Sequence, residues 1–95
     1  MNFNNVVDLT YDVTFDLNDT NEEPANMPAG SLITYQIEAG TYFSASGYQI
    51  PVPTRDGYTF LGWYTVKVPT AVNGAFTDLT PVQADLTLYA VWAKN

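Results

Sequence analysis

Apolar and polar residues alternate most clearly near the start of the chain. From residue 11 to residue 17 the odd-numbered positions are apolar and the even-numbered ones are polar: Tyr11, Val13, Phe15 and Leu17 against Asp12, Thr14 and Asp16. A period of two is typical of a β-strand that buries one face and exposes the other. We therefore predict a half-buried strand over residues 6–17.

A second strand is predicted over residues 31–38, where Ile33, Tyr35 and Ile37 share one face that points toward the core. The intervening residues 18–30 contain two prolines and no periodic apolar pattern, which indicates a loop. The simplest arrangement pairs the two strands antiparallel across this long loop.

The most apolar stretch is an aromatic run over residues 57–64, which holds four aromatic residues and two glycines. Such enrichment predicts a strand with a large contribution to the core, entered through a tight turn at Asp56-Gly57. A glycine inside a strand packs nothing, so Gly62 indicates a bulge or a close approach of another side chain. The last strand, over residues 86–92, is apolar on both faces and is therefore expected inside the sheet.

The segment between the second strand and the aromatic run is harder to interpret. Residues 41–47 favour a single helical turn, capped by Thr41 and ended by Gly47, over a short strand. The turn would pack Tyr42 and Phe43 under the sheet. No stretch sustains a period of 3.6, so we predict an α+β, β-rich fold with at most one short helix.

The length and composition indicate one folded domain over residues 1–95, with an ordered core at about residues 6–93. Hydrophobic residues make up 46% and aromatic residues 15% of the 95 residues, enough for one modest core. Phe60 and Trp92 are expected in that core, and Trp92 is expected to be mostly buried.

The chain carries a net charge of −7, with Arg55, Lys67 and Lys94 as its only cations. Three scattered cations do not form the basic face that nucleic acid or an anionic membrane surface requires. No apolar stretch approaches the roughly 20 residues of a membrane span. Cysteine and histidine are absent, which removes thiolate chemistry, disulfides and the commonest general base. We therefore expect no cofactor and no catalytic residues.

One polar pattern resembles the start of a calcium-binding loop: Asp16, Asn18, Thr20 and Glu22 lie at alternate positions. The helix-loop-helix calcium site also needs glycine at its sixth and glutamate at its twelfth position. Asn21 and Met27 stand there instead. We interpret this segment as a solvated acidic loop and predict no metal site.

Three tyrosines are candidates for ligand contact: Tyr42, Tyr48 and Tyr64. An exposed ring beside polar groups can stack on a sugar, which would make the chain a carbohydrate-binding module. The alternative is that these rings are buried or scattered singly over the surface, which needs no ligand. We expect the second outcome, because Tyr42 and Tyr48 flank a bend at Gly47.

Two aromatic motifs follow each other in the second half of the chain: Gly57-Tyr58-Thr59-Phe60-Leu61-Gly62-Trp63-Tyr64-Thr65 and, after Phe76, Ala84-Asp85-Leu86-Thr87-Leu88-Tyr89-Ala90-Val91-Trp92. In this order and spacing they resemble the Listeria–Bacteroides repeat family, which includes the B-repeat of internalin-type surface proteins. The lead-in Pro53-Thr54-Arg55-Asp56-Gly57 and the opening strand also fit, so the resemblance covers about residues 11–92. Segments 21–30 and 39–50 are longer than the family pattern.

The resemblance implies a small β-grasp-like domain with a mixed sheet. Such domains are found in tandem in large bacterial surface proteins, with roles in spacing, adhesion and host or matrix interaction. It places no catalytic residue. The leading hypothesis is thus a non-catalytic, extracellular module of a bacterial cell-surface protein, monomeric within a longer chain, that acts as a spacer or binds a protein or glycan. A carbohydrate-binding module is the alternative.

Overall fold

A computed structural model describes residues 9–70 and 74–95. Six strands and one 3-10 turn make up its regular structure: β1 (Thr10–Asp16), β2 (Ala25–Asn26), β3 (Thr34–Glu38), η1 (Phe43–Ser46), β4 (Thr54–Arg55), β5 (Tyr58–Tyr64) and β6 (Leu86–Lys94). Among the described residues η1 is the one helical segment. The predicted β-rich fold with at most one short helix is therefore confirmed.

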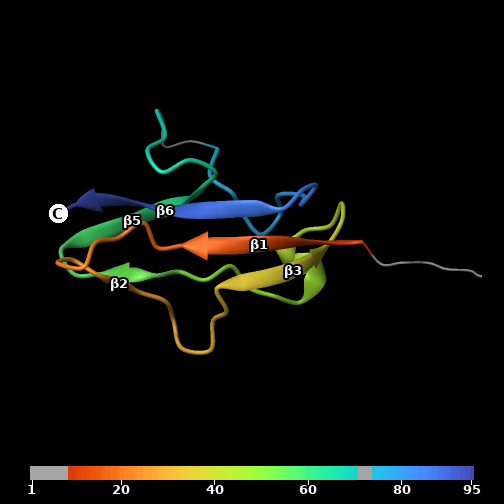
Figure 1. Cartoon of the computed structure of the whole chain (residues 1–95), viewed down its shortest axis with the longest axis horizontal. Coiled ribbons are helices and arrows are strands. Elements are labelled where there is room, and N and C mark those ends of the chain that lie inside the picture. The colour runs from red at the N-terminus through yellow and green to blue at the C-terminus, as the bar shows by residue number, and fades with distance from the viewer. Residues whose placement is uncertain (1–8, 71–73) are drawn as a thin grey trace, which may run out of the picture.

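Four strands form the main sheet, in the order β3-β1-β6-β5 (Figure 1). β1 pairs antiparallel with β3 and parallel with β6, and β5 pairs antiparallel with β6. The sheet is therefore mixed. Both pairing predictions are confirmed: the first two long strands are antiparallel, and the last strand lies inside the sheet, as its apolar character on both faces requires.

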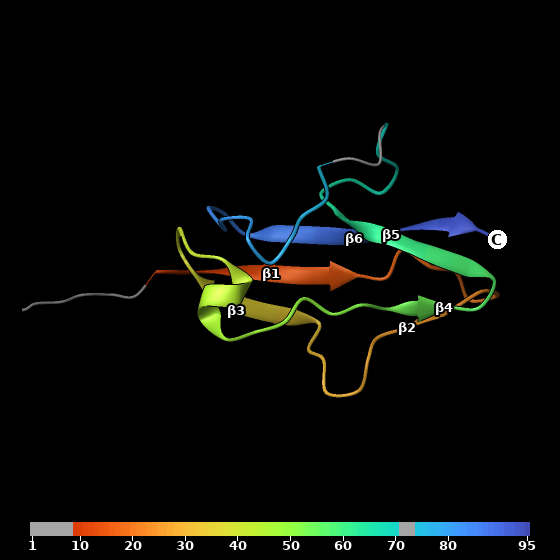
Figure 2. The ribbon, with the colours of Figure 1, turned by 180° about the vertical axis from the view of Figure 1, so that it is seen from behind.

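The parallel pair at the centre sets the direction of the chain. Val13 to Asp16 of β1 lie beside Leu86 to Tyr89 of β6, and β6 then continues past the end of β1. Consequently β1 starts at one end of the sheet and β6 finishes at the opposite end (Figure 1). Figure 2 shows that η1 and the segment after it run across the face of β1 and β3.

The aromatic strand β5 contains the bulge predicted at Gly62. Phe60 lies opposite Trp92 and Gly62 opposite Val91, so the strand carries one extra residue at this point. Gly62 has a φ of 139°, and a Cβ there would lie 3.0 Å from the Cβ of Ala75 and 3.3 Å from Cε1 of Tyr64. Glycine is needed here for two reasons: residues with a side chain rarely adopt this backbone conformation, and a Cβ would be too close to its neighbours.

We expect Gly62→Ala to lower the free energy of unfolding by about 1–3 kcal/mol, the usual cost of a strained backbone position. Ala75 cannot yield freely to the added methyl group, because the next residue, Phe76, donates its backbone N–H to the Trp63 carbonyl. Chemical denaturation measures the loss, and Gly57→Ala (φ of 80°, open space around its Cβ) separates the backbone cost from the steric one. Equal losses for the two variants would show that contact with Ala75 contributes nothing.

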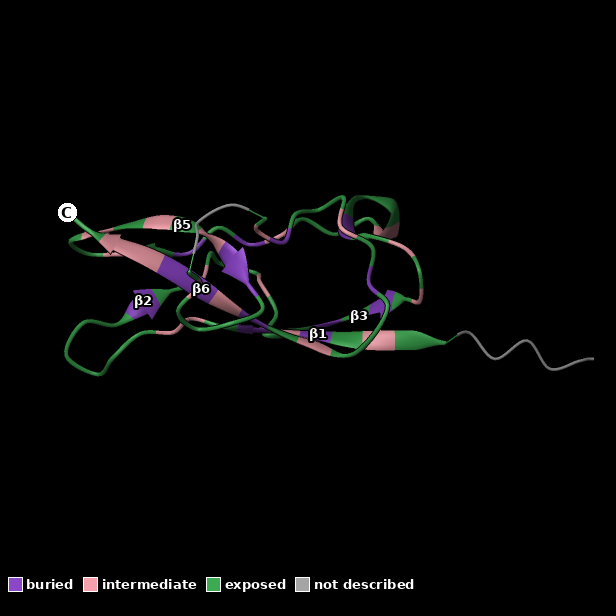
Figure 3. Cartoon of the chain, turned by 90° about the horizontal axis from the view of Figure 1, so that it is seen from above, coloured by how far each residue is buried: buried purple, intermediate pink, exposed green. Residues whose placement is uncertain are grey.

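The core lies on the face of the sheet that η1 and residues 48–53 cover, and Trp63 is its largest fully buried side chain, 1% exposed. The Phe15 ring lies 4.6 Å from the Trp63 ring, and the indole N–H of Trp63 donates to the Pro51 carbonyl at 2.8 Å. Phe60 and Trp92, both expected in the core, instead pack against it as partly buried residues. Buried positions concentrate in the middle of β6 and at the end of β5 (Figure 3).

Three expectations about individual side chains are wrong. Ile33 is 55% exposed rather than part of the inner face, because β3 starts only at Thr34 and the chain bends at residue 33. Thr41 does not cap the helical turn: Tyr42 holds that position, and the Thr41 hydroxyl donates to the Glu38 carbonyl instead. Gly47 ends the turn with a φ of 81°, as predicted, and Phe43 is fully buried. Tyr42, expected under the sheet beside Phe43, is 37% exposed instead, because the residue before the turn points its side chain outward.

The segment predicted as a plain loop, residues 18–30, contains a strand that the sequence did not indicate. The two residues of β2 pair antiparallel with β4, in a small second sheet. A two-residue strand is too short to show any period, so pattern analysis misses it. The first residues of the predicted opening strand and core, 6–8, lie outside the described residues.

Candidate functional site

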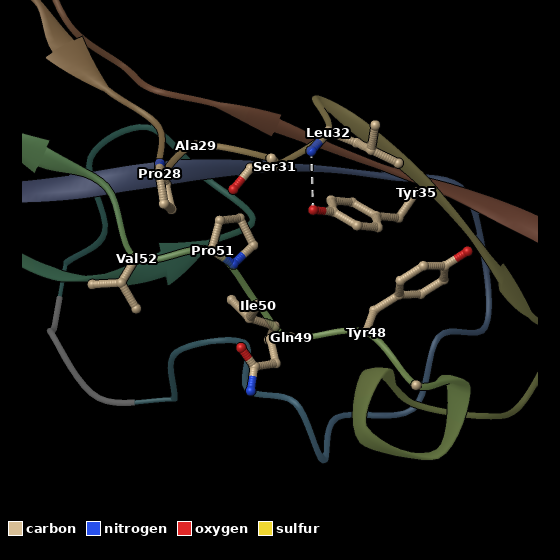
Figure 4. A pocket seen from close by; sticks show the side chains of 12 residues that line it. Pro28, Ala29, Ser31, Leu32, Tyr35, Tyr48, Gln49, Ile50, Pro51 and Val52 are labelled. Atoms are coloured by element: carbon tan, nitrogen blue, oxygen red, sulfur yellow. Dashed lines mark hydrogen bonds between the residues drawn. The ribbon is translucent and has the colours of Figure 1, made fainter.

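A surface groove of about 700 Å³ separates two segments that are distant in the sequence (Figure 4). One wall is residues 28–32, which lead into β3, and the other is residues 47–52, which follow η1. Tyr35 of β3 closes the groove at one end. None of the described residues that line the groove is charged, although the whole chain carries a net charge of −7. We call this site the Tyr48 groove.

Tyr48 is the exposed aromatic residue of the groove. Its side chain is 42% exposed, and its ring lies 5.1 Å from the Tyr35 ring and 6.5 Å from the Phe43 ring in edge-on contact. These contacts fix one edge of the Tyr48 ring against the core. The remainder of the side chain is free to meet a ligand.

Tyr35 contributes a hydroxyl that the sequence pattern does not single out, because the pattern assigns Tyr35 to the buried face of its strand. The ring is indeed buried, at 7% exposure. Its oxygen accepts a hydrogen bond from the Leu32 backbone N–H at 3.0 Å, drawn as a dashed line in Figure 4. A phenol that accepts one bond still has its own proton to donate.

The structure separates the three candidate tyrosines. Tyr42, at the start of η1, is 37% exposed and does not line the Tyr48 groove. Tyr64, the last residue of β5, is only 6% exposed, and its ring lies against Gly62 of the same strand. Tyr64 therefore has no flat exposed ring in this structure, and Tyr48 is the one of the three that lines this groove.

The groove suits a neutral ligand. Ligand sites commonly have volumes of about 300–1,000 Å³ and combine apolar walls with a few polar groups that orient the ligand. Here the apolar part comes from Pro28, Leu32, Pro51 and Val52, and hydroxyl or amide groups come from Ser31, Tyr35, Tyr48 and Gln49. An aromatic ring with nearby hydroxyl and amide groups can stack on a sugar or on a proline-containing peptide.

Polar side chains of residues 16–22 form hydrogen bonds with the protein's own backbone. Asp16 Oδ1 accepts from the Asn18 backbone N–H at 2.8 Å, and Asn18 Nδ2 donates to the Ala90 and Lys67 carbonyls, each at 3.0 Å. Asp19 accepts in the same way from the Ala25 N–H. Among the described residues no group of three or more acidic, histidine or cysteine side chains could hold a metal ion.

A second cluster joins the long loop to the β4–β5 turn. The Arg55 guanidinium lies 3.9 Å from the centre of the Tyr58 ring, and its Nε donates to the Glu23 carbonyl. The Tyr58 hydroxyl donates to Glu23 Oε1 at 2.6 Å. This hydrogen bond raises the pKa of Tyr58 above its ordinary value, and desolvation and the negative charge of Glu23 act in the same direction. The positive charge of Arg55 opposes them.

Because the neutral phenol is the donor to the Glu23 carboxylate, the part of this bond's stabilisation that depends on Tyr58 keeping its proton is complete below about pH 10, the ordinary pKa of tyrosine. This contribution is lost as the pH rises through the raised pKa of Tyr58. We expect NMR titration of the Tyr58 ring to give a pKa above 10, and Glu23→Gln, which removes the charge but keeps an acceptor, to lower it. A Tyr58 pKa at or below 10 would contradict the bond.

The part of the chain that the structure describes has no helix long and apolar enough to cross a membrane.

Comparison with known proteins matches most of the chain to one protein family. The Listeria-Bacteroides repeat domain matches residues 11–91, which is most of the chain. Internalin H from Listeria monocytogenes serovar 1/2a is 36% identical over 87 residues, which cover 90% of this chain. The chain spans only 13% of the length of internalin H. No solved structure matches the chain.

Proposed function

The chain belongs to the Listeria-Bacteroides repeat family, and on this premise we propose that it is a non-catalytic module of a bacterial cell-surface protein that acts as a spacer. The observation that carries the proposal is the position of the two central strands. β1 starts at one end of the elongated sheet and the parallel strand β6 finishes at the other (Figure 1). Segments joined before β1 and after β6 would therefore leave in opposite directions.

The length gained per module follows from the strand register. Asp16 at the end of β1 lies beside Tyr89, and β6 continues from there to Lys94. At about 3.3 Å per residue, the path from Thr10 along β1 and on to Lys94 advances about 36 Å. A domain whose ends lay side by side would add almost nothing to the reach of a longer protein.

Charge supports an extended arrangement of successive modules. A net charge of −7 on 95 residues makes neighbouring copies repel one another at low ionic strength, and salt weakens this repulsion. Compact stacking of copies on each other is thereby disfavoured.

Small-angle X-ray scattering of one, two and three linked copies tests the spacer function. We expect the maximum dimension to grow by about 36 Å or more with each copy, as the strand geometry requires. Linked copies that fold back on each other, with little growth in the maximum dimension, would refute the proposal.

Carbohydrate binding is a second candidate function, and the uncharged Tyr48 groove is the observation that favours it. A glycan array tests it with a matched pair of variants. Tyr48 and Tyr42 are 42% and 37% exposed, but only Tyr48 lines the groove. Binding that is lost in Tyr48→Ala and kept in Tyr42→Ala would support the groove. The absence of any glycan hit, or equal loss in both variants, would exclude it.

A further inference from the structure

The central strands β1 and β6 lie on the path that tension would follow through the module. A force applied before β1 and after β6 pulls the two strands in opposite directions along their common axis. Since they are neighbours and parallel, this force slides one strand past the other. All hydrogen bonds of the ladder, from Val13 beside Leu86 to Asp16 beside Tyr89, are then loaded together.

Three further hydrogen bonds, each using a side chain, lengthen this contact at both ends. Before the ladder, the Asp12 backbone N–H donates to Asp85 Oδ1 at 2.9 Å. Beyond it, Asn18 Nδ2 donates to the Ala90 carbonyl at 3.0 Å, and the indole N–H of Trp92 donates to the Leu17 carbonyl at 2.9 Å. All three join β1 or its continuation to β6 or the residue before it.

The core protects the ladder on one face. Val13 and Phe15 of β1 and Leu88 and Ala90 of β6 are at most 2% exposed. Water that could replace a strained backbone hydrogen bond is excluded from that side. Sliding β1 along β6 also drags these side chains out of their packing, which adds to the resistance.

We propose that the β1–β6 pair, with the three side-chain bonds at its ends, is a mechanical clamp that keeps the module folded under end-to-end tension. The inference rests on the proposed spacer function, because only a module inside a tether carries such a load. The force in question is tension along the strands. It would arise when a bacterium is attached through an extended surface protein that contains this module.

Single-molecule force spectroscopy at constant force tests the clamp by changing the direction of pulling. The chain contains no cysteine, so cysteine handles attach only where they are introduced. Handles at the two chain ends load β1 against β6 in shear. In the second geometry the handles are attached at Thr10→Cys and Ala84→Cys, two exposed positions at the same end of the β1–β6 pair. Force between these handles separates the two strands from that end, one hydrogen bond after another. At the same force we expect unfolding to be at least about tenfold faster in the second geometry, which corresponds to about 1.4 kcal/mol in the barrier.

Equal unfolding rates in the two geometries would overturn the clamp. The handle variant must match the unmodified chain in its denaturation midpoint, so that a lower stability is not mistaken for an effect of direction. Unfolding under force is governed by the unfolding rate rather than by the equilibrium stability. When the two proteins have the same denaturation midpoint, a difference in their unfolding rates under force reflects the direction of pulling.

A matched pair at Asp85 tests the side-chain bonds. Asp85→Ala removes the acceptor for the Asp12 N–H, and Asp85→Asn keeps it while removing the charge. Under end-to-end force we expect Asp85→Ala to unfold about fivefold faster, and Asp85→Asn to unfold at the original rate. Thr34→Val removes the Thr34–Thr14 hydroxyl bond between β3 and β1, outside the sheared pair, and should leave the rate unchanged.

Two results would refute a specific role for the Asp12–Asp85 bond. One is that Asp85→Ala unfolds at the original rate, and the other is that Asp85→Asn and Thr34→Val unfold as fast as Asp85→Ala.

The spacer proposal and the clamp proposal can fail independently of each other. Linked copies that fold back in scattering refute the spacer and leave the force measurements standing, whereas equal rates in both pulling directions refute the clamp and leave the scattering result standing.

Discussion

Trp63→Ala is expected to lower the free energy of unfolding by about 3–5 kcal/mol, the usual cost of truncating a buried tryptophan. The side chain is 1% exposed and packs against Phe15 and Phe60. Its removal also leaves the Pro51 carbonyl without the indole donor that it has now. Domains of this kind are held together by only about 5–15 kcal/mol, so the variant should be at the edge of unfolding at room temperature.

Thermal denaturation followed by circular dichroism measures the effect. For a domain of this size a loss of 1 kcal/mol lowers the melting temperature by about 4–8 °C, so a fall of at least about 12 °C is expected. Trp92→Ala is the matched control, because Trp92 is a tryptophan of the same sheet that is only partly buried. If Trp92→Ala destabilises the protein as much as Trp63→Ala, the core is not centred on Trp63.

The long strands could be predicted from the sequence because each carries its own local signal. The alternation from residue 11 onward marks β1, and the apolar character of β6 on both faces places it inside the sheet. Gly62 indicates a bulge because a residue without a side chain interrupts an aromatic strand that otherwise packs a core. In each case a few neighbouring residues contain the information.

Features that depend on distant contacts could not be predicted. β2 and β4 are two residues each and form a ladder only because the long loop brings them together. The exposure of Ile33 depends on where β3 begins, which is fixed by its pairing with β1. The parallel direction of β1 and β6, which carries both the spacer and the clamp proposals, leaves no mark in the sequence of either strand.

The candidate site shows the same division. Tyr48 is one of the three candidate tyrosines, although its place beside the bend at Gly47 favours a ring without a ligand, and the structure puts it in a groove. Its partner Tyr35 and the opposite wall, residues 28–32, belong to segments that no local pattern connects with it. Whether an aromatic ring is exposed depends on packing: Tyr64 and Tyr48 look alike as candidates, yet only Tyr64 is covered.

Phe43→Ala should be the second most damaging substitution, at about 3–5 kcal/mol. Phe43 is fully buried and lies edge-on to Phe15, Tyr35 and Phe76, with ring centres 5.4–6.0 Å apart. It thereby fastens the lengthened segment 39–50 to the sheet. Each such aromatic pair contributes about 0.5–1.5 kcal/mol beyond the buried area, so the loss should lie in the upper part of the range.

Chemical denaturation of Phe43→Ala, with the neighbouring Tyr42→Ala as control, measures this anchoring. Tyr42 is 37% exposed, and its truncation should change the stability by no more than about 0.5 kcal/mol. Hydrogen exchange of residues 44–52 adds a local measurement: their protection should fall in Phe43→Ala, because the ring that holds this wall of the Tyr48 groove is gone. Unchanged stability and unchanged protection would mean that the segment is held to the sheet by contacts other than Phe43.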